Sequence, residues 1–129
     1  MSGYLLDTNA ALLALADPNR LSRATRRAVL SGPVVLSVVS YWEVVLKTMK
    51  GNLDAGDPRV WWHDALDQLA ASSLPLRPEH VAGACALPPV HKDPFDRMLI
   101  AQAIHEDLRF VTIDATVRRY SSAGLQVVG

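Results

Sequence analysis

Four acidic residues far apart in the chain each lie at or just beyond the end of an apolar segment that is typical of a strand. They are Asp7, Glu43, Asp96 and Asp114. In a fold that alternates strands with helices, ligands bind in the crevice outside the carboxyl ends of the strands, so residues at those ends can meet although they are distant in sequence. The placement therefore predicts one shared pocket of carboxylates.

A pocket of clustered carboxylates calls for a cation. Two unit charges about 5 Å apart at an effective dielectric constant near 20 repel by roughly 3 kcal/mol, so the group would take up protons at neutral pH unless a cation neutralised it. All the candidate ligands are oxygens, with no His or Cys beside them at ligand spacing. This donor set favours a hard divalent ion, Mg²⁺ first and Mn²⁺ second.

Each acid also has a purely structural explanation. Asp7 and Asp114 can each cap the helix or turn that follows. Glu43 stands three residues after Ser40, which is the spacing of a capping box. Asp96 falls in the first turn of an expected helix, where a negative charge stabilises by roughly 0.3 to 1 kcal/mol whatever its function. The metal-site prediction therefore depends on all four acids together.

Length and composition limit the class of protein. The chain has 129 residues, half of them hydrophobic, so we expect a single domain over residues 1–129. Its 13 basic and 13 acidic side chains cancel, so net charge argues neither for nor against a nucleic-acid partner. A single cysteine, no signal-like N-terminus and no apolar segment near the roughly 20 residues of a membrane span predict a soluble cytoplasmic protein with no membrane contact.

Periodicity and turn residues predict strands that alternate with helices. Such an alternation favours an α/β fold, a three-layer α/β/α sandwich with a mainly parallel central sheet. We assign Asp93 mainly to helix capping, with support of the pocket as its lesser role. The expected strands are 3–6, 34–36, 74–76, 110–113 and 125–128, and the expected helices are 8–16, 21–30, 38–49, one opened by Asp57-Pro58, 78–86 and one capped by Asp93 with Pro94 in its first position.

The four acids lie in recognisable motifs. These are Leu5-Leu6-Asp7-Thr8-Asn9, then Leu36 to Glu43 with Lys47, then His91 to Ala103, then Val111-Thr112-Ile113-Asp114. In this order, and over nearly the whole chain, they resemble the successive motifs of PIN-domain ribonucleases, most closely the VapC toxins of bacterial toxin–antitoxin pairs. The part from Asp93 to Ala103 is the most specific.

The resemblance implies a PIN-like fold and a Mg²⁺- or Mn²⁺-dependent endoribonuclease that acts as the toxin of a type II toxin–antitoxin system. On that resemblance the four acids take the active-site positions. Asp7 and Asp96 would hold the metal, with Asp114 and Glu43 binding directly or through water, and Glu43 would orient or deprotonate the attacking water.

Partners follow from the same resemblance. It implies an RNA substrate, a homodimer and a VapB-like antitoxin whose tail occupies a groove near the active site. Candidate contacts for these proteins are Trp61, Trp62 and the Leu12-to-Leu15 helix face, although ordinary core packing is the stronger explanation for the leucines. Arg97 and Lys47 are the candidate RNA-binding residues, although such side chains are usually a solvated face or pair with an acid.

Other classes fit the motifs less well. A haloacid-dehalogenase-like phosphatase would have a second aspartate where Asn9 stands, and a receiver domain would have a lysine late in the chain, whereas none follows Lys92. The alternative is a non-catalytic RNA- or protein-binding PIN-like module, against which the intact acids argue. We expect the four histidines to be surface or packing residues. Ser37 and Thr112 either bind the pocket acids by hydrogen bonds or serve as cap and strand residues.

Overall fold

The computed structural model describes residues 3–129, and its strands form one sheet in the order β3-β2-β1-β4-β5. Every strand pair in this sheet is parallel, which confirms the predicted mainly parallel arrangement. The strands are β1 (Tyr4–Leu6), β2 (Val34–Ser37), β3 (Ala71–Leu74), β4 (Arg109–Val111) and β5 (Val127–Val128).

Local capping sets the ends of most helices. Ser22, Ser37, Asp57 and Asp93 each accept a hydrogen bond from a backbone N–H in the first turn of the helix that follows. A proline after each of the two aspartates fits the first helical position, where no N–H is needed. The helices are α1 (Thr8–Ala16), α2 (Arg23–Ser31), α3 (Val38–Met49), α4 (Pro58–Gln68), α5 (Pro78–Ala86) and α6 (Pro94–His105), with the 3₁₀ segments η1 (Pro18–Arg20) and η2 (Ala115–Ala123).

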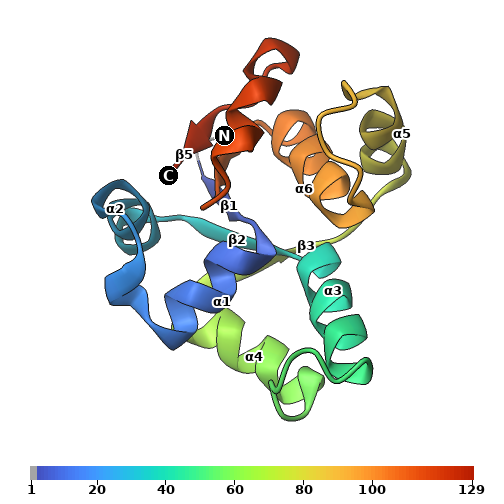
Figure 1. Cartoon of the computed structure of the whole chain (residues 1–129). Helices are drawn as coiled ribbons and strands as arrows, with labels where there is room; N and C mark the ends of the chain where they lie inside the picture. The colour runs from blue at the N-terminus through green and yellow to red at the C-terminus, as the bar shows by residue number, and fades with distance from the viewer. Residues whose placement is uncertain (1–2) are drawn as a thin grey trace.

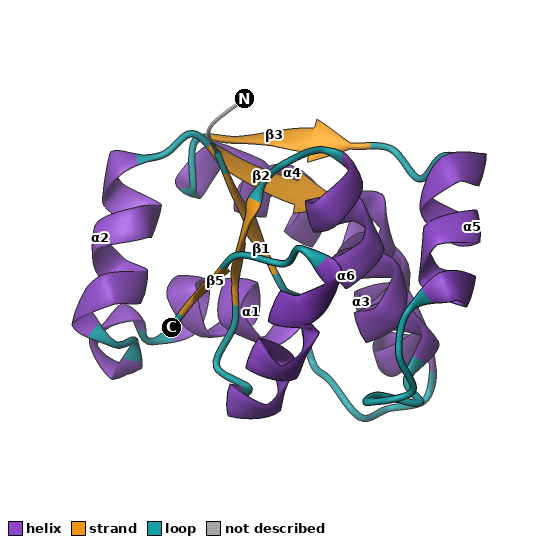
Figure 2. Ribbon diagram, turned by 90° about the horizontal axis from the view of Figure 1, so that it is seen from above, coloured by secondary structure: helices purple, strands orange, loops and turns teal. Residues whose placement is uncertain are grey.

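Both faces of the sheet are covered. Successive strand residues point to opposite faces, so the neighbours Leu5 and Leu6, both with no exposed surface, enter different hydrophobic clusters. Leu5 packs with α6, and Leu6 packs with α1, α2 and α4. The helix α5 lies outside α6, away from the strands (Figures 1 and 2). The predicted three-layer α/β/α sandwich is therefore confirmed.

Some predicted boundaries are wrong. The third strand was expected at 74–76 but ends at Leu74, because Pro75 has no N–H to donate to a neighbouring strand. The capping box at Ser40 does not form, because α3 begins at Val38 with Ser37 as its cap, where the Ser37 hydroxyl accepts from the Val39 N–H at 3.0 Å.

The order of the strands reverses beside β1. The chain proceeds from β1 to β2 and β3 on one side, and then returns to place β4 and β5 on the other side. Ligands of such sheets bind where the order reverses, outside the carboxyl ends of the strands. Here those ends are paired in register, Leu6 with Val111. Across residues 3–129, every helix is too short or too polar to cross a lipid bilayer.

Candidate active site

Four segments bring the predicted acids to the edge of the sheet formed by the carboxyl ends of β1 and β4. Asp7 directly follows β1, and Asp114 lies three residues after β4. Glu43 is in the second turn of α3, which continues directly from β2. Asp96 does not follow a strand as predicted, but occupies the third position of α6. It reaches the same edge because α6 precedes the parallel strand β4 and returns the chain to the start of that strand.

The four carboxylates act on one another electrostatically. The pKa of Asp96 is raised to about 7, first by burial and then by the negative charges of Asp93, Glu43, Asp7 and Asp114. Burial also raises the pKa of Asp7 above its usual range, and the charges of Glu43 and Asp114 raise it further, although two hydrogen bonds oppose them. The structure thus brings the four predicted acids into one electronegative pocket.

Thr112 joins two of the acids. Its hydroxyl donates a hydrogen bond to Oδ2 of Asp7 and accepts one from the backbone N–H of Asp114 at 3.0 Å. The other oxygen of Asp7 accepts from the N–H of Ala10 at 2.7 Å, so this side chain also caps α1. Both hydrogen-bonding roles proposed from sequence for Asp7 and Thr112 are therefore present, and each carboxylate oxygen of Asp7 is oriented by a donor.

Glu43 is the acid with an unused buried oxygen. The residue is 7% exposed, and its Oε2 lies 3.1 Å from the Lys47 ammonium one helical turn later. Its Oε1 is buried and has no hydrogen-bond partner among the described residues. A buried carboxylate oxygen without a partner is costly, so this atom is available to a water molecule or a cation.

Asp114 lies at the open side of the pocket. Its side chain is 43% exposed, and the hydrogen bond from the Thr116 hydroxyl is the main cause that lowers its pKa. Its Oδ2 also lies 3.3 Å from Nε2 of His91, which sequence reasoning treated as a surface or packing residue. The backbone N–H of His91 donates to the Tyr120 hydroxyl at 2.7 Å. The position of His91 at the start of the motif that runs to Ala103, two residues before Asp93, was the available signal for this role.

Arg97 has a structural role that its sequence position does not reveal. Its two terminal nitrogens donate to the carbonyl oxygens of Ala84, Leu87, Pro88 and His91 at 2.7 to 3.2 Å. These bonds fasten the end of α5 and the following loop to the first turn of α6. The predicted RNA contact by Arg97 is therefore unsupported, because the donors that would meet a phosphate are already engaged.

The pocket fits a hard divalent cation by its chemistry. Its donors are carboxylate oxygens. The carboxyl groups of Asp7 and Asp96 have raised pKa values, and the buried Oε1 of Glu43 lacks a partner. Within residues 3–129, however, no three of the four acids bring oxygens within 4.8 Å of one another. Binding would therefore use water bridges or side-chain movement, and Mg²⁺ usually keeps several of its waters.

A second group of potential ligands lies at the other end of α6. Donor atoms of His80, His105 and Glu106 lie within 4.8 Å of one another, about 15 Å from Asp96 along the helix. Nδ1 of the fully buried His80 accepts from the Arg77 N–H at 3.0 Å, so Nε2 carries the proton and donates to Glu106 at 2.9 Å. A metal would have to displace that proton, so the group is better explained as hydrogen-bonded packing between α5 and α6.

Comparison with known proteins places the chain. The profile of the PIN domain family matches residues 4–122. The ribonuclease VapC22 of Mycobacterium tuberculosis (strain ATCC 25618 / H37Rv) is 31% identical over 124 residues, which cover 93% of each chain.

Two crystal structures share the fold at low identity. VapBC2 from Rickettsia felis, bound to a promoter DNA fragment, aligns with a TM-score of 0.69 at 14% identity, over 98% of this chain and 97% of that one. FitAcB from Neisseria gonorrhoeae aligns with a TM-score of 0.65 at 21% identity, over 98% and 96%. Since the family match spans nearly the whole sequence, the chain belongs to the PIN domain family.

Proposed function

We propose that this protein is a metal-dependent endoribonuclease that acts as the toxin of a type II toxin–antitoxin system. The observation that carries the proposal is the group of four carboxylates from separate segments at the reversal of strand order, where burial and the neighbouring negative charges raise the pKa values of Asp7 and Asp96. The ribonuclease VapC22 is a relative at 31% identity over 93% of the chain. We further propose that residues 1–129 act as one PIN-like domain in the cytoplasm.

The proposed cofactor is Mg²⁺, with Mn²⁺ as the second choice, held by Asp7, Asp96, Asp114 and Glu43. When bound, a divalent ion of this kind lowers the pKa of coordinated water and neutralises charge on the phosphate. The protein's own contribution begins with orientation. Thr112 and the Ala10 N–H fix the two oxygens of Asp7, so that this carboxylate presents a defined geometry to the cation.

Glu43 is our candidate for the general base. Its Oε1 lacks a partner and can accept the proton of an attacking water, while the ion pair of Oε2 with Lys47 holds the carboxylate in place. Lys47 is 37% exposed, so an additional contact with the RNA backbone stays a prediction. The products are the two fragments of a hydrolysed phosphodiester.

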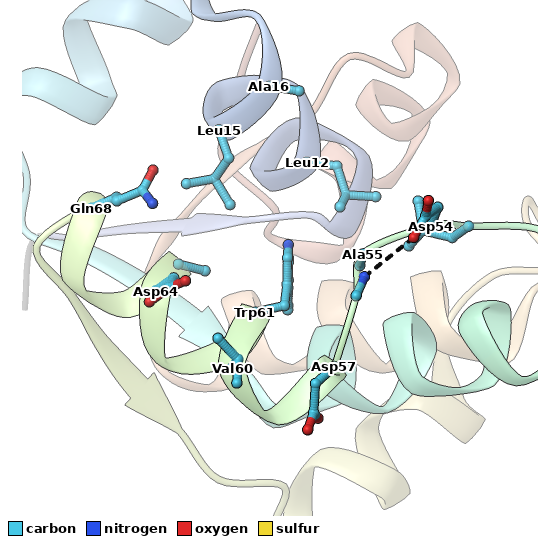
Figure 3. A pocket seen from close by; sticks show the side chains of 13 residues that line it. Leu12, Leu15, Ala16, Asp54, Ala55, Asp57, Val60, Trp61, Asp64 and Gln68 are labelled. Atoms are coloured by element: carbon cyan, nitrogen blue, oxygen red, sulfur yellow. Dashed lines mark hydrogen bonds between the residues drawn. The ribbon is translucent and has the colours of Figure 1, made fainter.

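A VapB-like antitoxin is the proposed protein partner, with a homodimer as the proposed assembly. A groove of about 550 Å³ between α1 and α4 offers a surface for the antitoxin. Leu12 and Leu15 from α1 face Trp61 from α4 across it (Figure 3). Asp54 and Asp64 also line the groove. An apolar floor with acidic margins suits an amphipathic segment that carries basic residues.

The two tryptophans at this groove differ. Trp61 lines it and is half-buried, as a contact residue should be. Trp62 is only 7% exposed and stacks on Tyr41, with ring centroids 4.9 Å apart and planes 5° apart. Trp62 therefore packs in the core, whereas Trp61 stays a candidate contact together with the Leu12-to-Leu15 face of α1.

Cleavage of RNA by the purified protein tests the enzymatic proposal. We expect strand breaks in Mg²⁺ that stop when EDTA is added, and loss of cleavage in Asp7→Asn. Asparagine can still cap α1, so Asp7→Asn should keep the circular dichroism spectrum of the wild type. Metal-independent cleavage, or full activity of Asp7→Asn, would contradict the proposal. RNA binding without cleavage under any divalent ion would instead favour the non-catalytic module.

A further inference from the structure

Trp42 is a large aromatic side chain exposed beside the acidic pocket. It is 48% exposed and directly precedes Glu43 on α3. Its other neighbour, Tyr41, points elsewhere, because consecutive residues on a helix are about 100° apart, and stacks on the buried Trp62. Packing against the core therefore accounts for the partly buried Tyr41, whereas Trp42 keeps about half of its surface in solvent, and the residue after it, Glu43, has a buried carboxylate oxygen without a partner among the described residues.

A second aromatic residue fixes the indole. The rings of Trp42 and Phe95 meet edge to face, with centroids 5.0 Å apart and planes at 84°. Phe95 directly precedes Asp96, and its backbone N–H donates to the capping Asp93 at 2.8 Å. The pair Trp42–Phe95 thus links the segments that hold Glu43 and Asp96.

Apart from the proposed cation, the acidic pocket has few charged groups that attract RNA. Its carboxylates repel phosphates, Arg97 donates to backbone carbonyls, and Lys47 shares its ammonium with Glu43. The chain as a whole is neutral. Stacking of bases on aromatic side chains supplies binding that does not depend on charge, and every base has a face for it.

We infer that Trp42 is a stacking platform for an unpaired RNA base that flanks the phosphate in the acidic pocket. This inference rests on the proposed nuclease function, and it requires the base on Trp42 to be unpaired. Bases inside a duplex are already stacked on one another and have no free face to offer. Trp42 is a positioning residue in this scheme, since it holds the nucleotide while the carboxylates act on the phosphate.

The test compares Trp42→Ala, Trp42→Leu and Trp42→Phe with wild type. Substrate binding is measured as fluorescence anisotropy of a labelled single-stranded oligoribonucleotide in Mg²⁺, with each change placed in the Asp7→Asn background to prevent cleavage. We expect Trp42→Ala to weaken binding by about fivefold to 150-fold, Trp42→Phe to restore most of it, and Trp42→Leu to restore little. Met49→Ala is the matched control, because Met49 is 76% exposed on the same helix two turns further on.

Cleavage kinetics separate this inference from the proposed function. In otherwise wild-type chains, Trp42→Ala should raise KM more than it lowers kcat, and cleavage of a hairpin should occur in its loop. If wild type cleaves but Trp42→Ala binds and cleaves equally well, or if Leu substitutes as well as Phe, the platform is refuted and the nuclease is not. If wild type cleaves no RNA, the proposed function fails first. Light scattering measures the mass of the assembly. If the mass of Trp42→Ala is half that of wild type and RNA binding returns at higher protein concentration, Trp42 is a subunit-contact residue and its role as a stacking platform is refuted.

Discussion

Replacing Asp96 by Asn should stabilise the metal-free protein while it abolishes the proposed activity. The pKa of Asp96 rises from 3.8 to about 7 because burial and four neighbouring acids disfavour its charged form. Each pKa unit corresponds to about 1.36 kcal/mol, so the full difference corresponds to about 4 kcal/mol. The side chain is half-buried, and screening by solvent reduces the expected gain to about 1–2 kcal/mol.

The gain must depend on pH in one direction. Below pH 3.8 the carboxyl group is protonated in both the folded and the unfolded chain, so its ionisation costs no stability. Between pH 3.8 and about 7 the unfolded chain releases this proton while the folded chain retains it, so the wild type loses stability as pH rises. Asp96→Asn lacks this loss. The difference in free energy of unfolding between Asp96→Asn and wild type should therefore grow from pH 3.8 to about 7 and become constant above pH 7.

Urea unfolding at several pH values measures the effect, with Asp67→Asn, an exposed site on α4, as the matched control. The midpoint difference between Asp96→Asn and wild type should be small near pH 4 and largest at pH 8, whereas Asp67→Asn should show no such trend. Mg²⁺ should stabilise wild type more than Asp96→Asn at pH 8, because the ion relieves the repulsion that the variant has already lost. If Asp96→Asn is less stable than wild type at pH 8 without metal, the carboxylates do not repel one another as argued.

Two further substitutions test the residues that hold the pocket together. Thr112→Val removes the donor to Asp7 and leaves the N–H of Asp114 without its partner, so it should lower the free energy of unfolding by about 1–3 kcal/mol and slow cleavage. Thr112→Ser retains both hydrogen bonds, so its urea midpoint and cleavage rate should stay close to those of wild type. A lysine cannot replace the planar guanidinium that donates to four carbonyls, so Arg97→Lys should lower the free energy of unfolding by a similar amount. An unchanged urea midpoint would show that those carbonyls do not need the guanidinium.

Elements with strong local signals were predictable from the sequence. The ranges of α1, α3 and α5 match the expected helices residue for residue, because capping side chains and prolines define them within a few positions. The short strands were less well defined. β4 was expected to continue to Ile113, yet it ends at Val111, where the Thr112 side chain turns to the pocket and binds Asp7. That contact joins residues 105 positions apart, and no local pattern encodes it.

The candidate site also contains residues that were predictable from the sequence and residues that were not. Asp7 and Asp114 could be singled out because they directly follow predicted strands, and the resemblance to PIN-domain proteins gave them a common role with Glu43 and Asp96. The positions of Asp96 and His91 depend on how α6 crosses back to the sheet, which only the folded chain determines. Arg97 looked like an RNA contact because a charge beside a catalytic motif is ambiguous in sequence. Its carbonyl partners belong to the preceding helix and loop, which a periodicity argument does not place.

The structural and catalytic explanations of the acids are compatible, and the fold uses both. Asp7 caps α1, Asp114 caps η2, and Asp96 lies in the first turn of α6. Three helical N-termini therefore converge on the pocket, and their partial positive charge favours anions there. This field offsets part of the repulsion among the carboxylates without removing it, since the pKa values of Asp7 and Asp96 stay raised. Asparagine in place of Asp7 or Asp114 keeps the capping geometry and loses the charge, so these two substitutions separate folding from catalysis at the same residues.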